Sequence, residues 1–73
     1  MIDPRRFYLQ RDDDETGVSG TGRVADGIEF DNGKAVLCWN SRLSSVAVYD
    51  SVHHIERIHG HQGRTRVVWI DES

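Results

Sequence analysis

Four histidines lie within nine residues of this 73-residue chain, at His53, His54, His59 and His61. Histidine is the side chain that most often binds transition metals in proteins. A zinc site needs three or four ligands that converge on one point. His54 and His61 would share a helical face only if the helix continued past Gly60, and His53 points away from His54. The simpler interpretation is that these histidines are polar residues of a helix face and a helix cap, and that the protein binds no cofactor. The alternative is a metal site formed by His54, His59 and His61.

Hydroxyl groups and an acid lie close to these histidines. Serines are frequent between residues 41 and 51, and Asp50 is the acid. A hydrolytic triad needs a nucleophile, a base and an orienting acid held in a cleft with an oxyanion hole. No stretch of the sequence resembles a nucleophile elbow, and so short a chain has little room for an enclosed pocket. We therefore expect no enzymatic activity.

Two strand-like runs, Lys34–Trp39 and Thr65–Ile70, are apolar on both faces. An exposed apolar patch on a protein surface usually marks an interaction site. The candidate protein-binding residues on these runs are Leu37, Trp39, Val68 and Ile70. The alternative is that a helix carrying Val52, Ile55 and Ile58 covers this surface. An exposed patch would serve a homodimer as well as a foreign partner.

The charges are unevenly distributed although the formal net charge is only −3. The run Asp12, Asp13, Asp14 and Glu15 holds four of the twelve acids, and we expect it to form a solvated loop that suits a basic host surface. Nucleic-acid binding usually needs a basic excess, so the net charge disfavours it. The alternative of a nucleic-acid-binding barrel would stack bases on Tyr8 or Trp39. Its basic residues would be Arg5, Arg11, Arg23, Arg64 and Arg66.

A single small domain, residues 1–73, must position these side chains, because a chain of this length holds one core. The pair Asn32-Gly33 predicts a two-residue type I′ turn between two strands, and Asp26-Gly27 predicts a bulge or bend. Alternating apolar residues predict strands over Arg5–Arg11, Arg23–Phe30, Lys34–Trp39, Val46–Tyr49 and Thr65–Ile70. Residues 1–4 are expected to be a loose end, and residues 12–22 an acidic, glycine-containing loop.

Between the last two strands the apolar spacing changes to that of a helix. Asp50-Ser51 offers an N-cap, and Gly60 offers a stop, so the pattern predicts a helix over Val52–His59. The order is then β-β-β-β-α-β, and short connections favour an antiparallel sheet that curls. We expect a small mainly-β fold, an SH3-like partly open barrel with one short helix before the last strand. The alternative is an α+β antiparallel sheet with the helix across one face.

Cys38 is the only cysteine of the chain and is expected to act as a small buried hydrophobe. The chain contains no disulfide framework, no apolar run long enough to span a membrane, and no apolar signal-peptide core at residues 1–6. We therefore expect a soluble cytoplasmic protein that does not contact membranes.

Several stretches together form a pattern. They are Thr-Gly-Val-Ser-Gly-Thr-Gly-Arg-Val-Ala-Asp-Gly-Ile-Glu-Phe at 16–30, Asn32-Gly33, Trp39, Tyr49-Asp50-Ser51, Ile-His-Gly-His-Gln-Gly at 58–63, and Val68-Trp69. The pattern resembles a set of short uncharacterised proteins of tailed bacteriophages and of some actinobacterial and archaeal genomes. The resemblance implies a phage or mobile-element origin, and it supplies no catalytic residues. We expect a non-catalytic accessory module that binds a host protein.

Overall fold

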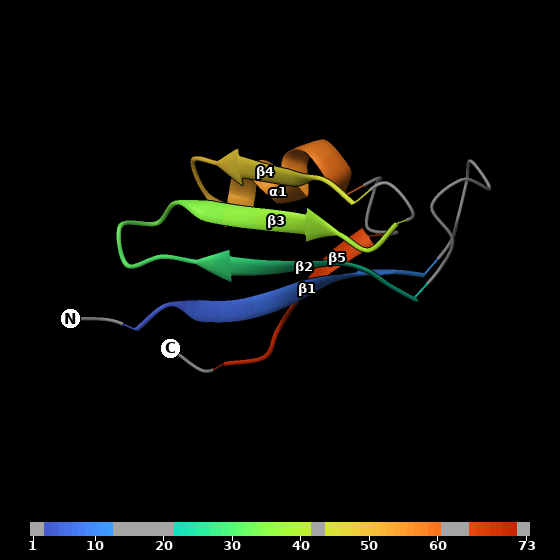
Figure 1. Cartoon of the computed structure of the whole chain (residues 1–73), viewed down its shortest axis with the longest axis horizontal. Coiled ribbons are helices and arrows are strands. Elements are labelled where there is room, and N and C mark those ends of the chain that lie inside the picture. The colour runs from blue at the N-terminus through green and yellow to red at the C-terminus, as the bar shows by residue number, and fades with distance from the viewer. Residues whose placement is uncertain (1–2, 13–21, 42–43, 61–64, 72–73) are drawn as a thin grey trace.

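The computed structural model describes residues 3–12, 22–41, 44–60 and 65–71 (Figure 1). Its elements are β1 (Arg5–Arg11), β2 (Gly22–Glu29), β3 (Ala35–Trp39), β4 (Val46–Tyr49), α1 (Val52–His59) and β5 (Thr65–Trp69). The predicted order β-β-β-β-α-β is confirmed, and each strand boundary lies within one residue of its prediction. Within the described part of the chain, no helix is long and apolar enough to cross a membrane.

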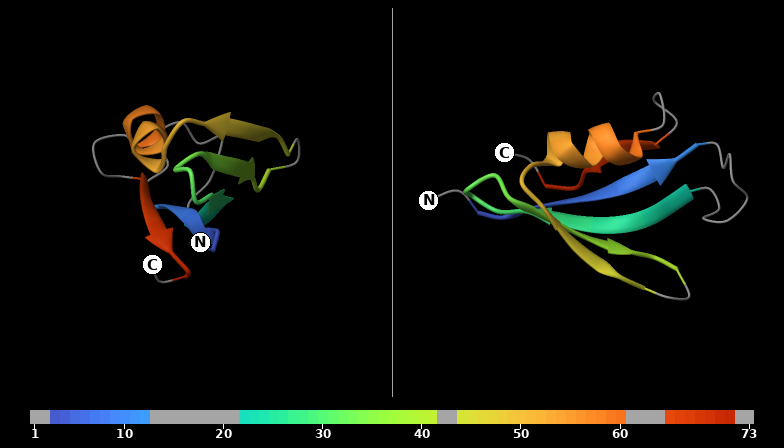
Figure 2. Two further views of the ribbon diagram at one scale, coloured as in Figure 1. Left: turned by 90° about the vertical axis from the view of Figure 1, so that its left-hand side faces the viewer. Right: turned by 90° about the horizontal axis from the view of Figure 1, so that it is seen from above.

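The five strands form one antiparallel sheet in the order β4-β3-β2-β1-β5. The sheet curves around α1, which contacts the two edge strands β4 and β5 (Figure 2). These edges do not pair with each other, so the sheet stays open. The predicted fold class, a small mainly-β fold with one short helix before the last strand, is confirmed as an open antiparallel sheet, and its SH3-like character stays a prediction.

The core lies between α1 and the face of the sheet that α1 covers. It consists of Phe7, Leu9, Val24, Ala25, Ala35, Leu37, Val52 and Ile55. The helix begins where predicted, because the Ser51 hydroxyl accepts a hydrogen bond of 3.1 Å from the His54 backbone N–H. Val52 and Ile55 are buried, but Ile58 is 50% exposed. Only the first two of the predicted apolar helix positions therefore contribute to the core.

The irregularity of β2 lies at Val24, two residues before the predicted position at Asp26-Gly27. Leu9 pairs with Ala25 and the next residue, Gln10, pairs with Arg23, so Val24 is an extra residue in β2. Such a bulge places two successive side chains on one side of the sheet, and both Val24 and Ala25 are buried. The alternation after the bulge is shifted by one position. In a regular strand Ile28 would share the face of Val24, four residues earlier, but after the bulge it lies on the opposite face.

The connection between β2 and β3 is longer than the predicted two-residue turn. The Phe30 carbonyl accepts a hydrogen bond from the Gly33 N–H at 2.9 Å, and the Phe30 N–H donates to the Lys34 carbonyl at 2.8 Å. The loop therefore contains the three residues 31–33. Gly33 ends it with φ of +90°, a conformation that glycine adopts without strain.

Candidate functional site

The face of the sheet opposite α1 carries no helix in the described structure, and we call it the open face. Two rows of cross-strand neighbours define it because paired residues lie on the same side of an antiparallel sheet. One row runs across the sheet through Val48, Val36, Ile28 and Arg6. The next row runs through Val46, Cys38, Asp26, Tyr8 and Val68.

The open face is apolar on the side of β4 and polar on the side of β1. The apolar half consists of Ile28, Val36, Cys38, Val46 and Val48. Val46 is 66% exposed and Val48 is 70% exposed, whereas Val36 and Cys38 are half-buried. None of these five side chains is charged. A contiguous apolar surface of this kind commonly marks a site of association.

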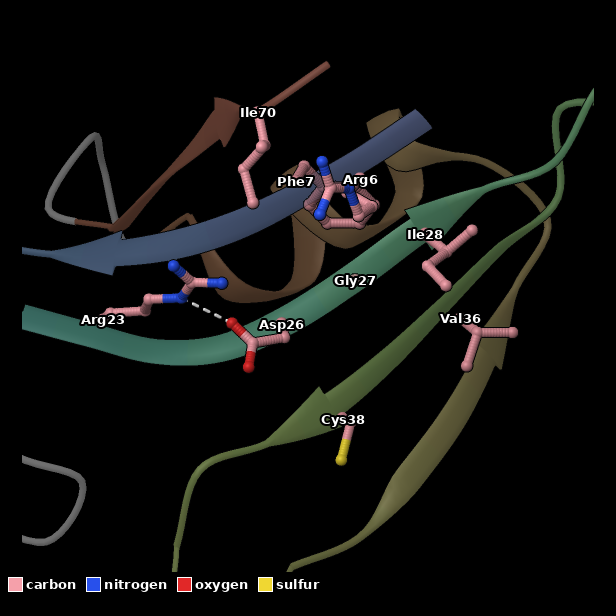
Figure 3. Close-up of a pocket in the computed structure, with 9 residues that line it drawn as sticks. All are labelled: Arg6, Phe7, Arg23, Asp26, Gly27, Ile28, Val36, Cys38 and Ile70. Carbon is pink, nitrogen blue, oxygen red and sulfur yellow. Dashed lines mark hydrogen bonds and ion pairs between the residues drawn. The ribbon is translucent and has the colours of Figure 1, made fainter. Parts of the chain in front are cut away.

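A hollow of about 300 Å³ lies where the two halves of the open face meet. Its lining comes from β1, β2, β3 and the residue after β5 (Figure 3). The apolar lining residues on the open face are Ile28, Val36, Cys38 and Ile70. Arg6, Arg23 and Asp26 supply its polar lining, and Phe7 and Gly27 complete it.

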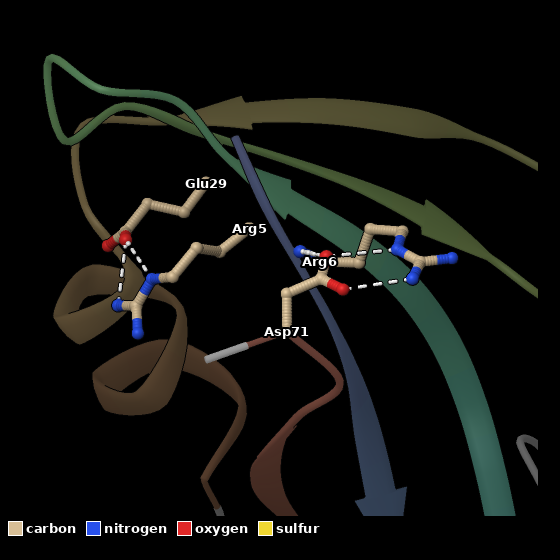
Figure 4. A network of polar contacts seen from close by, with 4 residues as sticks. All are labelled: Arg5, Arg6, Glu29 and Asp71. Atoms are coloured by element: carbon tan, nitrogen blue, oxygen red, sulfur yellow. Dashed lines mark hydrogen bonds and ion pairs between the residues drawn. The ribbon is translucent and has the colours of Figure 1, made fainter. Parts of the chain in front are cut away.

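The charged groups around the hollow are paired within the chain. The Arg6 guanidinium donates to both carboxylate oxygens of Asp71 at 2.9 Å, and the Arg6 backbone N–H also donates to Asp71 at 2.9 Å (Figure 4). Arg23 forms an ion pair with Asp26 and lies 4.5 Å from the centroid of the Tyr8 ring. Each arginine of the hollow therefore has an internal carboxylate partner, which leaves little net charge for a ligand to neutralise.

The ion pair of Arg6 and Asp71 predicts a dependence of stability on pH. Hydrogen bonds from the Arg6 side chain and backbone lower the pKa of Asp71 from its ordinary 3.8 to about 2. Because folding lowers this pKa, Asp71 stabilises the fold above its ordinary pKa, and the contribution is lost as the pH falls through about 2. We expect Asp71→Asn to be less stable than the unmodified chain at pH 7, and the difference to disappear as the pH falls below about 2. Urea unfolding of both proteins across this range measures the difference, and a constant difference at every pH would contradict the assignment.

The predicted protein-binding residues do not form one surface. Leu37 is fully buried under α1, and Trp39 packs against the same core with its ring centroid 4.9 Å from that of His59. Val68 lies on the open face, opposite Tyr8, and Ile70 lines the hollow. For Leu37 and Trp39 the alternative prediction applies, in which the helix covers the surface. The reason is that the odd-numbered side chains of β3 point toward α1. Val68 and Ile70 remain available for binding.

The described members of the predicted basic set lie on both faces, and Arg5, Arg23 and Arg66 each have a carboxylate partner. Arg5 forms an ion pair with Glu29 at 2.9 Å, and its guanidinium carbon lies 3.8 Å from the centroid of the Trp69 ring. Arg11 is buried and donates to the Thr65 hydroxyl at 3.1 Å. Arg66 contacts Asp12 at 3.2 Å, and the remaining predicted arginine, Arg64, lies outside the described residues, as do Asp13, Asp14 and Glu15 of the acidic run.

Two of the described histidines, His54 and His59, lie beside aromatic side chains, whereas His53 lies near Glu56. The Tyr49 hydroxyl and His59 Nε2 are 3.0 Å apart, and the His54 ring lies edge-on to Tyr49 with a centroid distance of 6.1 Å. Within the described ranges, no group of three or more His, Cys, Asp and Glu side chains is arranged to hold a metal ion. His61, the third member of the alternative metal site, lies outside these ranges.

Sequence reasoning did not single out the residues that line the hollow, except Arg23 and Ile70. Arg6 and Asp26 were overlooked because their partners are Asp71, 65 positions away, and Arg23 across the bulge. The alternation of β3 puts Val36 and Cys38 on one face, which is one of the two faces of this run that were predicted to be apolar. The apolar character of this face was therefore visible in the sequence. Only the position of α1 in the structure shows that it is the open face.

The fold and this face define a small α+β protein with one helix-covered and one open sheet face. The chain belongs to the Acb5 phage protein family, since the model of that family matches residues 4–71. The predicted resemblance to phage proteins is thereby confirmed, whereas its extension to actinobacterial and archaeal genomes stays a prediction. No curated protein and no solved structure matches the chain.

Proposed function

We propose that this phage protein is a small non-catalytic accessory module that binds a host protein in the cytoplasm of the infected cell. Its binding surface is the open face, centred on the hollow. The observation that carries the proposal is the uncovered apolar half, next to a hollow whose charged residues are already paired.

The hollow suits an apolar side chain of a partner protein. Interfaces gain most of their affinity from a few large side chains that fill well-packed pockets. Here Ile28, Val36 and Ile70 supply apolar walls, and the pairs Arg6–Asp71 and Arg23–Asp26 supply a polar rim. An apolar centre with a polar rim is the usual arrangement of a protein–protein interface.

The same charges argue against a nucleic acid as the main ligand. Binding to phosphates draws its affinity from cations that are free to replace counterions. Arg5, Arg23 and Arg66 each have a carboxylate partner, and Arg11 is buried. A phosphate backbone would have to compete with these internal partners. We therefore treat nucleic-acid binding as the less favoured alternative, and the test below distinguishes it from protein binding.

Substitutions on the two sides of the sheet test this proposal. We expect tagged wild-type chain to retain one host protein from nuclease-treated lysate, and Ile28→Asp to reduce its retention at least about tenfold by placing a charge beside the hollow. Ile58→Asp is the matched control, because Ile58 is 50% exposed and Ile28 is 39% exposed. Both variants should keep the circular dichroism of the wild-type chain.

The result that contradicts the proposal is equal retention of the host protein by Ile28→Asp and wild type. Retention that disappears after nuclease treatment would instead support the nucleic-acid alternative. Turnover of a host component by the purified chain would contradict the non-catalytic part of the proposal.

A further inference from the structure

Strand β4 has one edge that pairs with β3 and a second edge that no strand pairs with in the described structure. The Trp39 N–H donates to the Ser45 carbonyl at 3.0 Å. In an antiparallel ladder the hydrogen-bonded pairs alternate with pairs that are not hydrogen-bonded. The register therefore directs the backbone groups of residues 45, 47 and 49 toward β3, and those of Val46 and Val48 toward the free edge.

Apart from its short length of four residues, this free edge lacks the features that usually keep a strand from pairing with another chain. Natural edge strands are protected by lysine, proline, a bulge or an inward-pointing charge. Val46–Tyr49 contains no charged residue and no proline, and its register with β3 is unbroken. The two side chains that flank the free backbone groups, Val46 and Val48, are the most exposed large hydrophobic residues among those described.

We infer that two copies of this chain associate by antiparallel pairing of β4 with β4 around a two-fold axis at Ala47. In this register the backbone of Val46 in one copy is hydrogen-bonded to that of Val48 in the second copy, and the backbone of Val48 to that of Val46. The outward backbone groups of both strands are then satisfied, and the two five-stranded sheets become one continuous sheet.

The side chains select this register over its neighbours. A shift by one residue would place the outward backbone groups of one β4 strand opposite backbone groups of the other β4 strand that are already hydrogen-bonded to β3. A shift by two residues toward the helix would place Asp50 opposite Val46, and a shift the other way would place Val48 opposite Ser44. Each of these two-residue shifts keeps one valine pair, Val48 with Val48 or Val46 with Val46. Only the register centred on Ala47 pairs both valines of each strand with valines of the other, and so extends the apolar half of one copy directly into that of the second.

The dimer leaves the hollow accessible, since the hollow is lined by β1, β2, β3 and Ile70 rather than by β4. Because the two-fold axis is perpendicular to the sheet, both hollows lie on the same face of the dimer. A four-residue strand gives a small contact area compared with about 800 Å² per partner in a standard interface. We therefore expect association that depends on concentration within the micromolar-to-millimolar range.

Light scattering across a concentration series of the full chain tests this inference. We expect the mass to rise from 8.3 kDa toward twice that value as the concentration increases. Val48→Pro should remain a monomer, because proline at this position removes an outward N–H while the bonds from β4 to β3 are retained. Val48→Lys should also remain a monomer and keeps the backbone unchanged.

Ile58→Lys is the control, since it adds the same charge at an exposed residue of α1 and should dimerise like the wild-type chain. Circular dichroism shows whether each variant is folded. A wild-type chain that stays monomeric up to about 1 mM would overturn the inference, because so weak an association lies outside the expected range. A folded Val48→Lys variant that dimerises as strongly as wild type would overturn it equally. Neither result depends on whether a host protein binds the hollow.

Discussion

Replacing Phe7 by alanine is expected to lower the free energy of unfolding by about 3–5 kcal/mol. Phe7 is fully buried on the inner strand β1, and its ring packs against Trp69 with a centroid distance of 5.3 Å. A domain of this size has a total stability of about 4–11 kcal/mol, so the loss removes a large part of it. Urea unfolding followed by tryptophan fluorescence measures the change.

The ring of Phe7 also explains why residue 27 is glycine. A Cβ atom at Gly27 would lie less than 3.0 Å from ring carbons of Phe7. Gly27→Ala should therefore destabilise the fold by about 1–3 kcal/mol through overpacking. In a chain that already carries Phe7→Ala, the added methyl group meets no ring and should cost less. Additive effects of the two substitutions in a double-mutant cycle would contradict this explanation.

The local parts of the fold were predictable because they rest on neighbouring residues. The spacing of Val52 and Ile55 after the Ser51 cap gave the helix with its observed bounds. The alternation in β1 puts the apolar residues Phe7 and Leu9 on one face of the strand, and both are buried in the structure. Each of these patterns depends on interactions within a few positions of the chain, where periodicity carries the information.

The parts that were not predicted depend on residues far apart in the sequence. Val24 and Ala25 are both small and apolar, so their pattern gave no sign that the bulge falls there rather than at Gly27. The two faces of β3 were separated correctly, but which of them α1 covers is decided by the path of the chain between β4 and β5. The candidate site was missed for the same reason, since its rim joins Arg6 to Asp71.

The second large effect on stability is expected for substitutions on the two faces of β3. Leu37 is fully buried against the helix, and its neighbour Val36 lies on the open face. Leu37→Ala removes side-chain atoms from a packed core and should cost about 2–5 kcal/mol. Val36→Ala changes a half-buried residue and should cost less than about 1.5 kcal/mol, because part of its surface already contacts water. Urea unfolding of the two variants measures the contrast.

The contrast between these adjacent residues separates stability from binding. If the open face is the binding surface, Val36→Ala should weaken capture of the host protein while the chain remains folded. Leu37→Ala, measured at a temperature and urea concentration where it is still folded, should bind as wild type does, because its side chain does not reach the open face. Equal losses of stability in the two variants would mean that both faces of β3 are covered, which would contradict the two-faced sheet on which the proposed function depends.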